Sequence, residues 1–116
     1  MKILIAEDDQ TNFHIMEIYL KQDKHDITWA KNGQEAVDFI NNTFDVVLMD
    51  IKMPILDGIE ATKLIRRKNF IKPIIAQTAY QLTELELREA GFTHYINKPI
   101  NFTKLLRLLK SMDKKH

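Results

Sequence analysis

The most constraining feature of this sequence is a short apolar run at 46–49 (VVLM) that ends at Asp50 and is soon followed by Pro54. A run this short, β-branched at its start and free of polar residues, is typical of a strand buried on both faces. The loop limited by Pro54 cannot simply continue that strand. The pattern therefore predicts that Asp50 is presented at the rim of a sheet rather than hidden inside it.

The rest of the chain alternates between two kinds of segment. Strands are predicted at 3–6, 26–30, 46–50, 73–76 and 93–97, and helices at 11–21, 59–67, 83–90 and 102–112. A further helix is predicted to follow the turn at 32–33 and to end at about 41. The alternation of Ile27 and Trp29 suits a half-covered edge strand, and Gly91 is typical of a residue that ends a helix. Five strands alternating with five helices predict a parallel sheet with right-handed crossovers and helices on both faces.

Apolar spacing also predicts which helix faces turn inward. In the first helix the apolar side is formed by Phe13, Met16, Ile18 and Leu20. In the third helix we expect Ile59, the stem of Lys63 and either Leu64 or Ile65 to face the core. The basic stretch 66–68 (RRK) is expected to be a solvated helix end, where cations oppose the helix dipole favourably.

Composition sets limits on the function. A chain of 116 residues, 45% of them hydrophobic, is expected to form one domain over 1–116 with a real core. The absence of cysteine excludes thiolate chemistry and fits a reducing compartment. A net charge of +1 provides no field to attract nucleic acid or an anionic membrane. No apolar run approaches the ~20 residues of a membrane span, so we expect a cytoplasmic chain or a cytoplasmic piece of a larger protein.

Polar residues follow four of the predicted strands. These residues are Glu7, Asp8, Asp50, Thr78 and Lys98. The carboxyl ends of parallel strands meet at one end of a sheet, so these side chains are expected to converge. Crowded carboxylates repel one another unless a cation lies among them, and Mg²⁺ is the expected ion. The hydroxyl and the ammonium group on the far side suit the oxygens of a phosphoryl group.

Four motifs carry a resemblance to a known family: ILIAEDD, VVLMDIKMPILDG, the Thr-Ala of AQTAY and the Lys-Pro of YINKPI. Together, and in this order, they resemble the receiver domain of two-component response regulators from end to end. The resemblance implies an α/β, flavodoxin-like (βα)5 sandwich with five parallel strands in the order 2-1-3-4-5. It also implies a single receiver domain over 1–116 with no output domain present.

The resemblance further implies a chemistry centred on Asp50. Asp50 would be the phosphoacceptor, taking a phosphoryl group from a phosphohistidine of a histidine kinase or histidine phosphotransfer protein. Mg²⁺ would be bound by Asp8, Asp50 and the backbone carbonyl of Lys52, with Glu7 acting mainly through water. The domain would be a signalling switch that assists its own phosphorylation, and not a turnover enzyme.

A second group of residues is implied to read out phosphorylation. Lys98 would pair with the phosphoryl group, and Thr78 would move toward it. Tyr95 corresponds to the family's switch aromatic, expected to swing inward as Thr78 moves, although a plain edge-strand aromatic is an equal alternative. The family also leads us to expect a cis Lys98-Pro99 bond. The expected partners are the phosphodonor and a downstream target or output domain, without direct contact to nucleic acid and without membrane insertion; phosphorylation-dependent dimerisation stays open.

Several points depart from the family or stay open. Asp9 leaves the register of the metal-binding acids open by one residue, and the acids could instead cap a helix. The segment 78–91 is short for the family, so the fourth helix is expected to be short or irregular. Lys52 and Tyr80 stand where the family tunes dephosphorylation. The four histidines, His14, His25, His94 and His116, show no metal spacing and are interpreted as ordinary surface or helix residues.

Other functions would require different residues or remain as alternatives. A Mg²⁺-dependent phosphatase of the haloacid dehalogenase type, or a toprim enzyme, would show Asp-x-Asp, whereas Lys52 stands two residues after Asp50. A flavodoxin-like cofactor binder would need a phosphate-binding loop after the first strand, which Thr11 alone does not make. A receiver-like scaffold that signals without phosphorylation also remains an alternative. Within the family, the residues of these motifs resemble most those of hybrid sensor kinases.

Overall fold

The computed structural model describes residues 1–79 and 82–113. Tyr80 and His116 lie outside the described residues, so the expectations placed on them stay untested. In the described part, β1 (Lys2–Ala6), β2 (Asp26–Ala30), β3 (Val46–Asp50), β4 (Ile74–Thr78) and β5 (His94–Asn97) form one parallel sheet in the order β2-β1-β3-β4-β5. The helices are α1 (Gln10–Gln22), α2 (Gly33–Phe39), α3 (Gly58–Arg67), α4 (Glu84–Ala90) and α5 (Phe102–Met112). The predicted flavodoxin-like order is confirmed.

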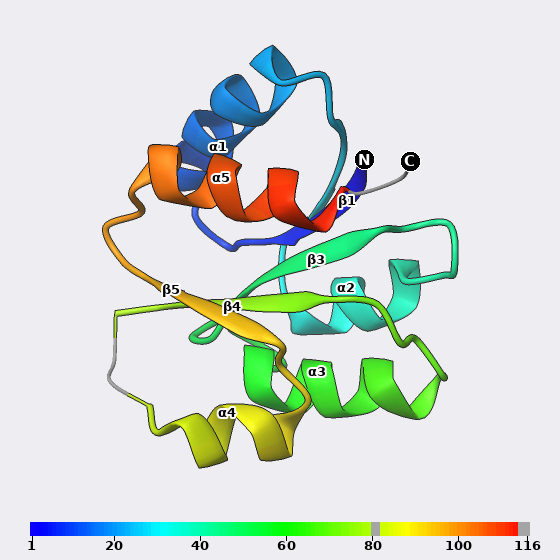
Figure 1. Cartoon of the computed structure of the whole chain (residues 1–116). Helices are drawn as coiled ribbons and strands as arrows, with labels where there is room; N and C mark the ends of the chain where they lie inside the picture. Colours follow the sequence, from blue (N-terminus) through cyan, green and yellow to red (C-terminus); the bar gives the residue numbers. More distant parts are fainter. Residues whose placement is uncertain (80–81, 114–116) are drawn as a thin grey trace.

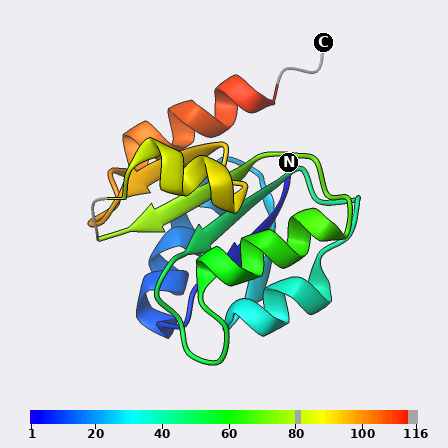
Figure 2. The same ribbon diagram turned by 90° about the horizontal axis from the view of Figure 1, so that it is seen from below.

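The helices cover the sheet in two layers. Figure 1 shows α1 and α5 on one face and α2, α3 and α4 on the other, and Figure 2 gives the view onto the second layer. Side chains alternate between the faces along each strand, so each layer buries its own core. Leu48 and Ile75 pack under α1 and α5, whereas Met49 and Ala76 pack on the opposite side. The apolar residues 46–49 of the central strand β3 are buried, as the sequence predicts. Asp50 ends the strand as predicted but is only 4% exposed, so it is more hidden than expected.

Polar side chains set the helix starts. Asp9, Asn32, Asp57, Thr83 and Asn101 each accept a backbone N–H three residues further along the chain. Helix α4 has seven residues, which confirms that it is short, and it ends at Gly91 in the left-handed conformation with a φ of 110°. No helix among the described residues is both long and apolar enough to cross a membrane.

Two of the predicted helix faces need correction. Ile18 on α1 is 59% exposed, because Phe13, Met16 and Leu20 already form the inward stripe at helical spacing. On α3 the buried side chains are Ala61, Thr62 and Ile65, and Ile59 is only partly buried. Lys63 lies beside that stripe and faces solvent near Glu60, so its stem does not pack inward.

The basic stretch after α3 is also more than a solvated end. The Arg66 guanidinium donates to the backbone carbonyls of Gly91, Phe70 and Lys72 at 2.7–2.9 Å. Lys68 Nζ donates to the Val37 carbonyl at the end of α2 at 2.6 Å. Both cations therefore satisfy carbonyl groups left over at chain reversals.

One histidine is placed differently from the prediction. His25 is buried, and its Nδ1 lies 3.1 Å from the amino group of Met1. Burial, followed by the nearby positive charge of that amino group, lowers the pKa of His25. His14 and His94 are exposed, as expected for surface residues.

Candidate functional site

The predicted polar residues converge in one cleft at the carboxyl end of the sheet. Glu7 and Asp8 follow β1, Asp50 and Thr78 end β3 and β4, and Lys98 follows β5. The cleft has a volume of about 390 Å³ and is lined by Glu7, Asp8, Asp9, Asn12, Asp50, Ile51, Lys52, Thr78, Ala79 and Lys98. Every predicted site residue except Tyr95 therefore lies in the same cleft.

Three carboxylates meet in this cleft. Glu7, Asp8 and Asp50 each offer an oxygen within 4.8 Å of the others. Glu7 and Asp50 are almost fully buried, with exposed fractions of 1% and 4%, whereas Asp8 is exposed. Burial, with the Asp50 charge as the next cause, raises the pKa of Glu7 to about 7. The crowding of negative charge expected from the sequence is thus present in the structure.

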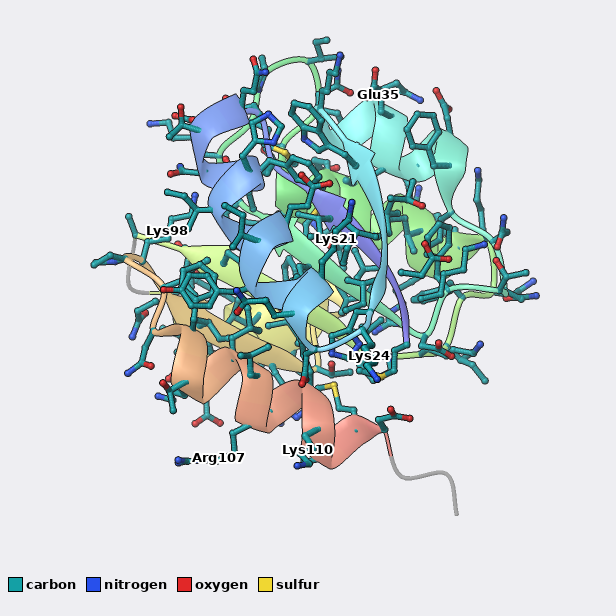
Figure 3. All side chains as sticks on the ribbon, turned by 90° about the horizontal axis from the view of Figure 1, so that it is seen from above. Lys21, Lys24, Glu35, Lys98, Arg107 and Lys110 are labelled. Atoms are coloured by element: carbon teal, nitrogen blue, oxygen red, sulfur yellow. The ribbon has the colours of Figure 1, made fainter. Side chains whose placement is uncertain are left out.

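Lys98 partly balances that charge. Its Nζ lies 2.9 Å from Asp50 Oδ1 and 3.6 Å from Glu7 Oε1. Burial alone would lower the pKa of Lys98, but the Asp50 and Glu7 carboxylates together outweigh it and the pKa is raised. The Lys98-Pro99 bond is cis, as expected. Figure 3 shows Lys98 where β5 leads into α5, and Lys24 toward the other end of α1.

The structure distinguishes Asp9 from its two acidic neighbours. Asp9 Oδ1 accepts a hydrogen bond of 3.1 Å from the backbone N–H of Asn12, which caps α1. The Asp9 backbone N–H donates to Glu7 Oε2 at 3.2 Å and so holds the Glu7 side chain in place. The group that could hold a metal ion is formed by Glu7, Asp8 and Asp50.

These residues fit a hard divalent cation. The donor set consists of carboxylate oxygens, which suit Mg²⁺. Glu7 Oε1 is buried and has no hydrogen-bond partner among the described residues, so the site leaves one of its negative atoms unsatisfied. A cation, or water bound to it, would satisfy that atom.

The loop after Asp50 is fixed by Gly58, a contact that sequence reasoning missed. The Gly58 N–H donates to the Ile51 carbonyl at 2.7 Å. A Cβ on Gly58 would lie 2.0 Å from the backbone oxygen of Asp50, so only glycine allows this approach. The Asp57-Gly58 pair ends the motif VVLMDIKMPILDG, but the motif alone does not show how closely Gly58 approaches the Asp50 backbone.

Trp29 provides a second unanticipated contact. We expected core or edge packing for Trp29, and its ring does stack on Phe13 with centroids 4.3 Å apart. In addition, Trp29 Nε1 donates to the backbone carbonyl of Glu7 at 2.8 Å. The edge strand β2 is therefore connected directly to the acidic end of β1.

Tyr95 does not belong to the cleft in this structure. It lies on β5, is 50% exposed, and lines a separate cavity of about 620 Å³ between α4, β5 and α5. This position agrees with an exposed edge-strand aromatic, and no inward position is seen.

The fold and the acidic cleft together define the class of protein, an α/β domain of the flavodoxin-like receiver type. Comparison with known proteins gives the family: residues 3–110 match the response regulator receiver domain, and the chain belongs to that family.

Three relatives illustrate the similarity. The chain is 39% identical over 112 residues to hybrid signal transduction histidine kinase I of Dictyostelium discoideum, covering 86% of this chain and 6% of that protein. It is 34% identical to the receiver domain of the sensor histidine kinase PA1611 from Pseudomonas aeruginosa PAO1, solved with a magnesium ion coordinated in its active-site cleft. That structure gives a TM-score of 0.85 and covers 96% of this chain and 95% of its own.

The third relative was solved with a partner. It is the receiver domain of Ssk1 from Saccharomyces cerevisiae, crystallised with the histidine phosphotransfer protein Ypd1. The identity is 31% and the TM-score 0.87, with 97% of this chain and 88% of that chain covered. The chain therefore spans nearly all of the receiver domains it resembles but a small part of the curated hybrid kinase.

Proposed function

We propose that this receiver domain takes a phosphoryl group from a phosphohistidine onto Asp50, with Mg²⁺, and then changes conformation to control a partner. The observation that carries the proposal is the placement of the Asp50 carboxylate. It is buried at the end of the central strand, paired with Lys98 at 2.9 Å, and within 4.8 Å of the Glu7 and Asp8 oxygens. Thr78 lines the same cleft.

The residues of the cleft have different proposed roles in binding Mg²⁺. Asp8, Asp50 and the backbone carbonyl of Lys52 would hold Mg²⁺, with Glu7 acting through bound water. The ion would supply neutralisation of the phosphoryl oxygens during in-line transfer. The Asp9 N–H keeps Glu7 turned toward the cleft, since it donates to the other Glu7 oxygen.

Phosphoryl transfer would then proceed at the Asp50 side chain. A carboxylate oxygen of Asp50 attacks phosphorus, an O–P bond forms, and the P–N bond to the donor imidazole breaks with its electron pair left on nitrogen. Lys98 Nζ, already at the carboxylate, follows the charge onto the phosphoryl oxygens. The Thr78 hydroxyl donates to the same oxygens, and Tyr95 moves inward behind it, which shifts an existing two-state equilibrium of the β4–α5 region.

The partners follow from this chemistry. The donor is a histidine kinase or a histidine phosphotransfer protein, a proposal supported by the Ssk1 receiver domain bound to Ypd1. The similarity to a hybrid kinase supports a place in a phosphorelay, in the cytoplasm, ahead of a downstream target or output domain. The chain is proposed to act as a signalling domain, not as a turnover enzyme.

Intact mass spectrometry tests the proposal. The wild type and Asp50→Asn are incubated with phosphoramidate or acetyl phosphate, with and without Mg²⁺. We expect one phosphoryl group on the wild type, only with Mg²⁺, removed by hydroxylamine as an acyl phosphate is, and none on Asp50→Asn. Asp57→Asn is the matched control, because asparagine also caps a helix and this acid lies in the same loop.

Three outcomes would contradict the proposal. Equal mass gain in the wild type and Asp50→Asn would place the acceptor elsewhere. Repeated turnover of a phosphomonoester without a stable phosphorylated form would favour a Mg²⁺-dependent hydrolase. A wild type that binds Mg²⁺ but takes no phosphoryl group would indicate a scaffold that signals without phosphorylation.

A further inference from the structure

A buried amide that the proposed function leaves unused lies beside Asp50. Gln77 on β4 is 1% exposed, and among the described residues neither its Nε2 nor its Oε1 has a hydrogen-bond partner. Burying a primary amide without partners is unfavourable, and methionine would fill a similar volume without that penalty. A hydrogen-bond partner that reaches the Gln77 amide only in another state of the site would explain why a glutamine is buried here.

The register of the sheet places Gln77 next to the phosphoacceptor. Leu48 of β3 and Ile75 of β4 are register partners, and both pack under α1 and α5. Two residues further along, Asp50 and Gln77 are again register partners, and side chains two apart share a face of the sheet. Neighbouring strands lie about 4.8 Å apart. The Gln77 and Asp50 side chains therefore lie on the same face of neighbouring strands, directly beside one another.

A second group without a hydrogen bond among the described residues lies on the other side of Asp50, in the same row of side chains across the strands. Ala6 and Met49 are register partners, so Glu7 is the neighbour of Asp50 on the other side. Glu7 Oε1, Gln77 Nε2 and Gln77 Oε1 are all buried without hydrogen bonds among the described residues. Lys98 approaches both carboxylates in this row. If Lys98 moves away, the carboxylates of this row are left without that donor and need another one.

We infer that Gln77 is a positioning residue for phosphoryl transfer to Asp50. Once the phosphoryl group draws Lys98 away, the Gln77 Nε2–H replaces Lys98 as hydrogen-bond donor to the side-chain carbonyl oxygen of phosphorylated Asp50. A carbonyl oxygen has two lone pairs, so this contact is compatible with a cation on the same atom. The inference rests on the proposed function of Asp50. It adds to the site a residue of β4 that directly precedes Thr78.

The contact exists only after Lys98 has moved, so it stabilises the phosphorylated form relative to the resting form. Its loss should slow the formation of the acyl phosphate and lower the phosphorylated fraction at a given donor concentration. One hydrogen bond of ordinary strength corresponds to a change of roughly five- to tenfold. Folding stability should not fall, because the unsatisfied amide is removed with it.

The test compares Gln77→Met with the wild type by intact mass over time, with phosphoramidate and saturating Mg²⁺, and by urea unfolding. Gln77→Met is expected to be at least as stable as the wild type and to be phosphorylated roughly five- to tenfold more slowly. Gln77→Asn keeps an amide on a shorter side chain and should show an intermediate rate. Ile75→Leu is the matched control, since it changes packing on the same face of the same strand and should leave the rate unchanged.

The outcomes separate this inference from the proposed function. A wild type that is phosphorylated, with Gln77→Met equal to it in rate and level, overturns the role of Gln77 alone. Equal loss of rate in Gln77→Met and Ile75→Leu, in step with stability, also overturns it, because packing would then explain both. A wild type that takes no phosphoryl group overturns the proposed function and this inference with it.

Discussion

Trp29 Nε1 donates a hydrogen bond of 2.8 Å to the backbone carbonyl of Glu7, so the one tryptophan of the sequence is bonded to the acidic end of β1. The edge strand β2 and the acidic end of β1 are thereby coupled by a side-chain hydrogen bond, in addition to the backbone hydrogen bond of 3.0 Å from the Glu7 N–H to the Ala30 carbonyl. Any change in the backbone at Glu7 should alter the surroundings of the indole ring.

We therefore predict that Mg²⁺ changes the fluorescence of Trp29 in a saturable titration. Asp8→Asn should weaken or abolish the response, because it removes one of the three clustered carboxylates. Asp38→Asn, which changes an exposed acid on α2, should leave it unaltered. An equal response in Asp8→Asn and the wild type would show that the fluorescence does not report this site.

The stability of the protein without metal should depend on pH through Glu7. Its pKa of about 7 lies above the ordinary value of 4.5, first because of burial and then because of Asp50. Between these two values the folded state keeps a proton that the unfolded state releases. The free energy of unfolding should therefore fall as pH rises through this window and level off above it.

Glu7→Gln should remove that dependence and raise the free energy of unfolding near about pH 8 by roughly 2 kcal/mol. Urea unfolding in a chelating buffer at several pH values measures this. Saturating Mg²⁺ should also reduce the slope in the wild type, because the ion binds the ionised acids. Glu89→Gln, at an exposed position of α4, is the control; a slope unchanged in Glu7→Gln would assign the pH dependence to another group.

Arg66 should contribute strongly to stability although it lies far from the cleft. Its guanidinium donates to three backbone carbonyls, at the end of α4 and in the turn between α3 and β4. Arg66→Ala leaves these carbonyls without a donor and should cost roughly 3 kcal/mol in urea unfolding. Arg66→Lys should recover only part of this, because lysine lacks the planar fork. The neighbouring Arg67→Ala, at an exposed position, should change stability little; similar losses in both variants would refute the assignment.

Gly58 should be sensitive to the smallest substitution. In Gly58→Ala the new Cβ would meet the backbone oxygen of Asp50 at 2.0 Å, so the loop or the end of β3 must shift. We expect a loss of roughly 2–3 kcal/mol in stability and slower phosphorylation of Asp50, measured by urea unfolding and intact mass. Glu60→Ala, in the first turn of the same helix, should leave the phosphorylation rate unchanged. Wild-type behaviour of Gly58→Ala would mean that the loop accommodates a methyl group.

Much of the fold could be predicted from the sequence because its signals are local. Short apolar runs marked the strands, turn residues such as Gly91 marked the helix ends, and the predicted element bounds agree with the structure to within a few residues. The convergence of Glu7, Asp50 and Lys98 followed from one rule, that parallel strands end on the same side. These predictions required no knowledge of how helices pack.

The incorrect predictions depend on contacts that are not local in the sequence. Ile18 and Lys63 were assigned to the core from broad apolar spacing, but the inward stripe depends on the neighbour that each helix meets. Arg66 and His25 read as surface residues because their partners, Gly91 and the Met1 amino group, lie about 25 positions away in the sequence. Charge and residue type do not reveal such contacts.

The sequence by itself determined the order of the elements and the set of acids, hydroxyl and lysine at the carboxyl end of the sheet, because strand ends and residue types are local properties. The tertiary structure alone decided that Asp9 caps a helix while Asp8 joins the carboxylate group, and that Gly58 approaches the Asp50 backbone. It also decided that Gln77 lies beside Asp50 with no hydrogen-bond partner for its amide among the described residues. These facts depend on register and on distances between strands that meet only in the folded chain.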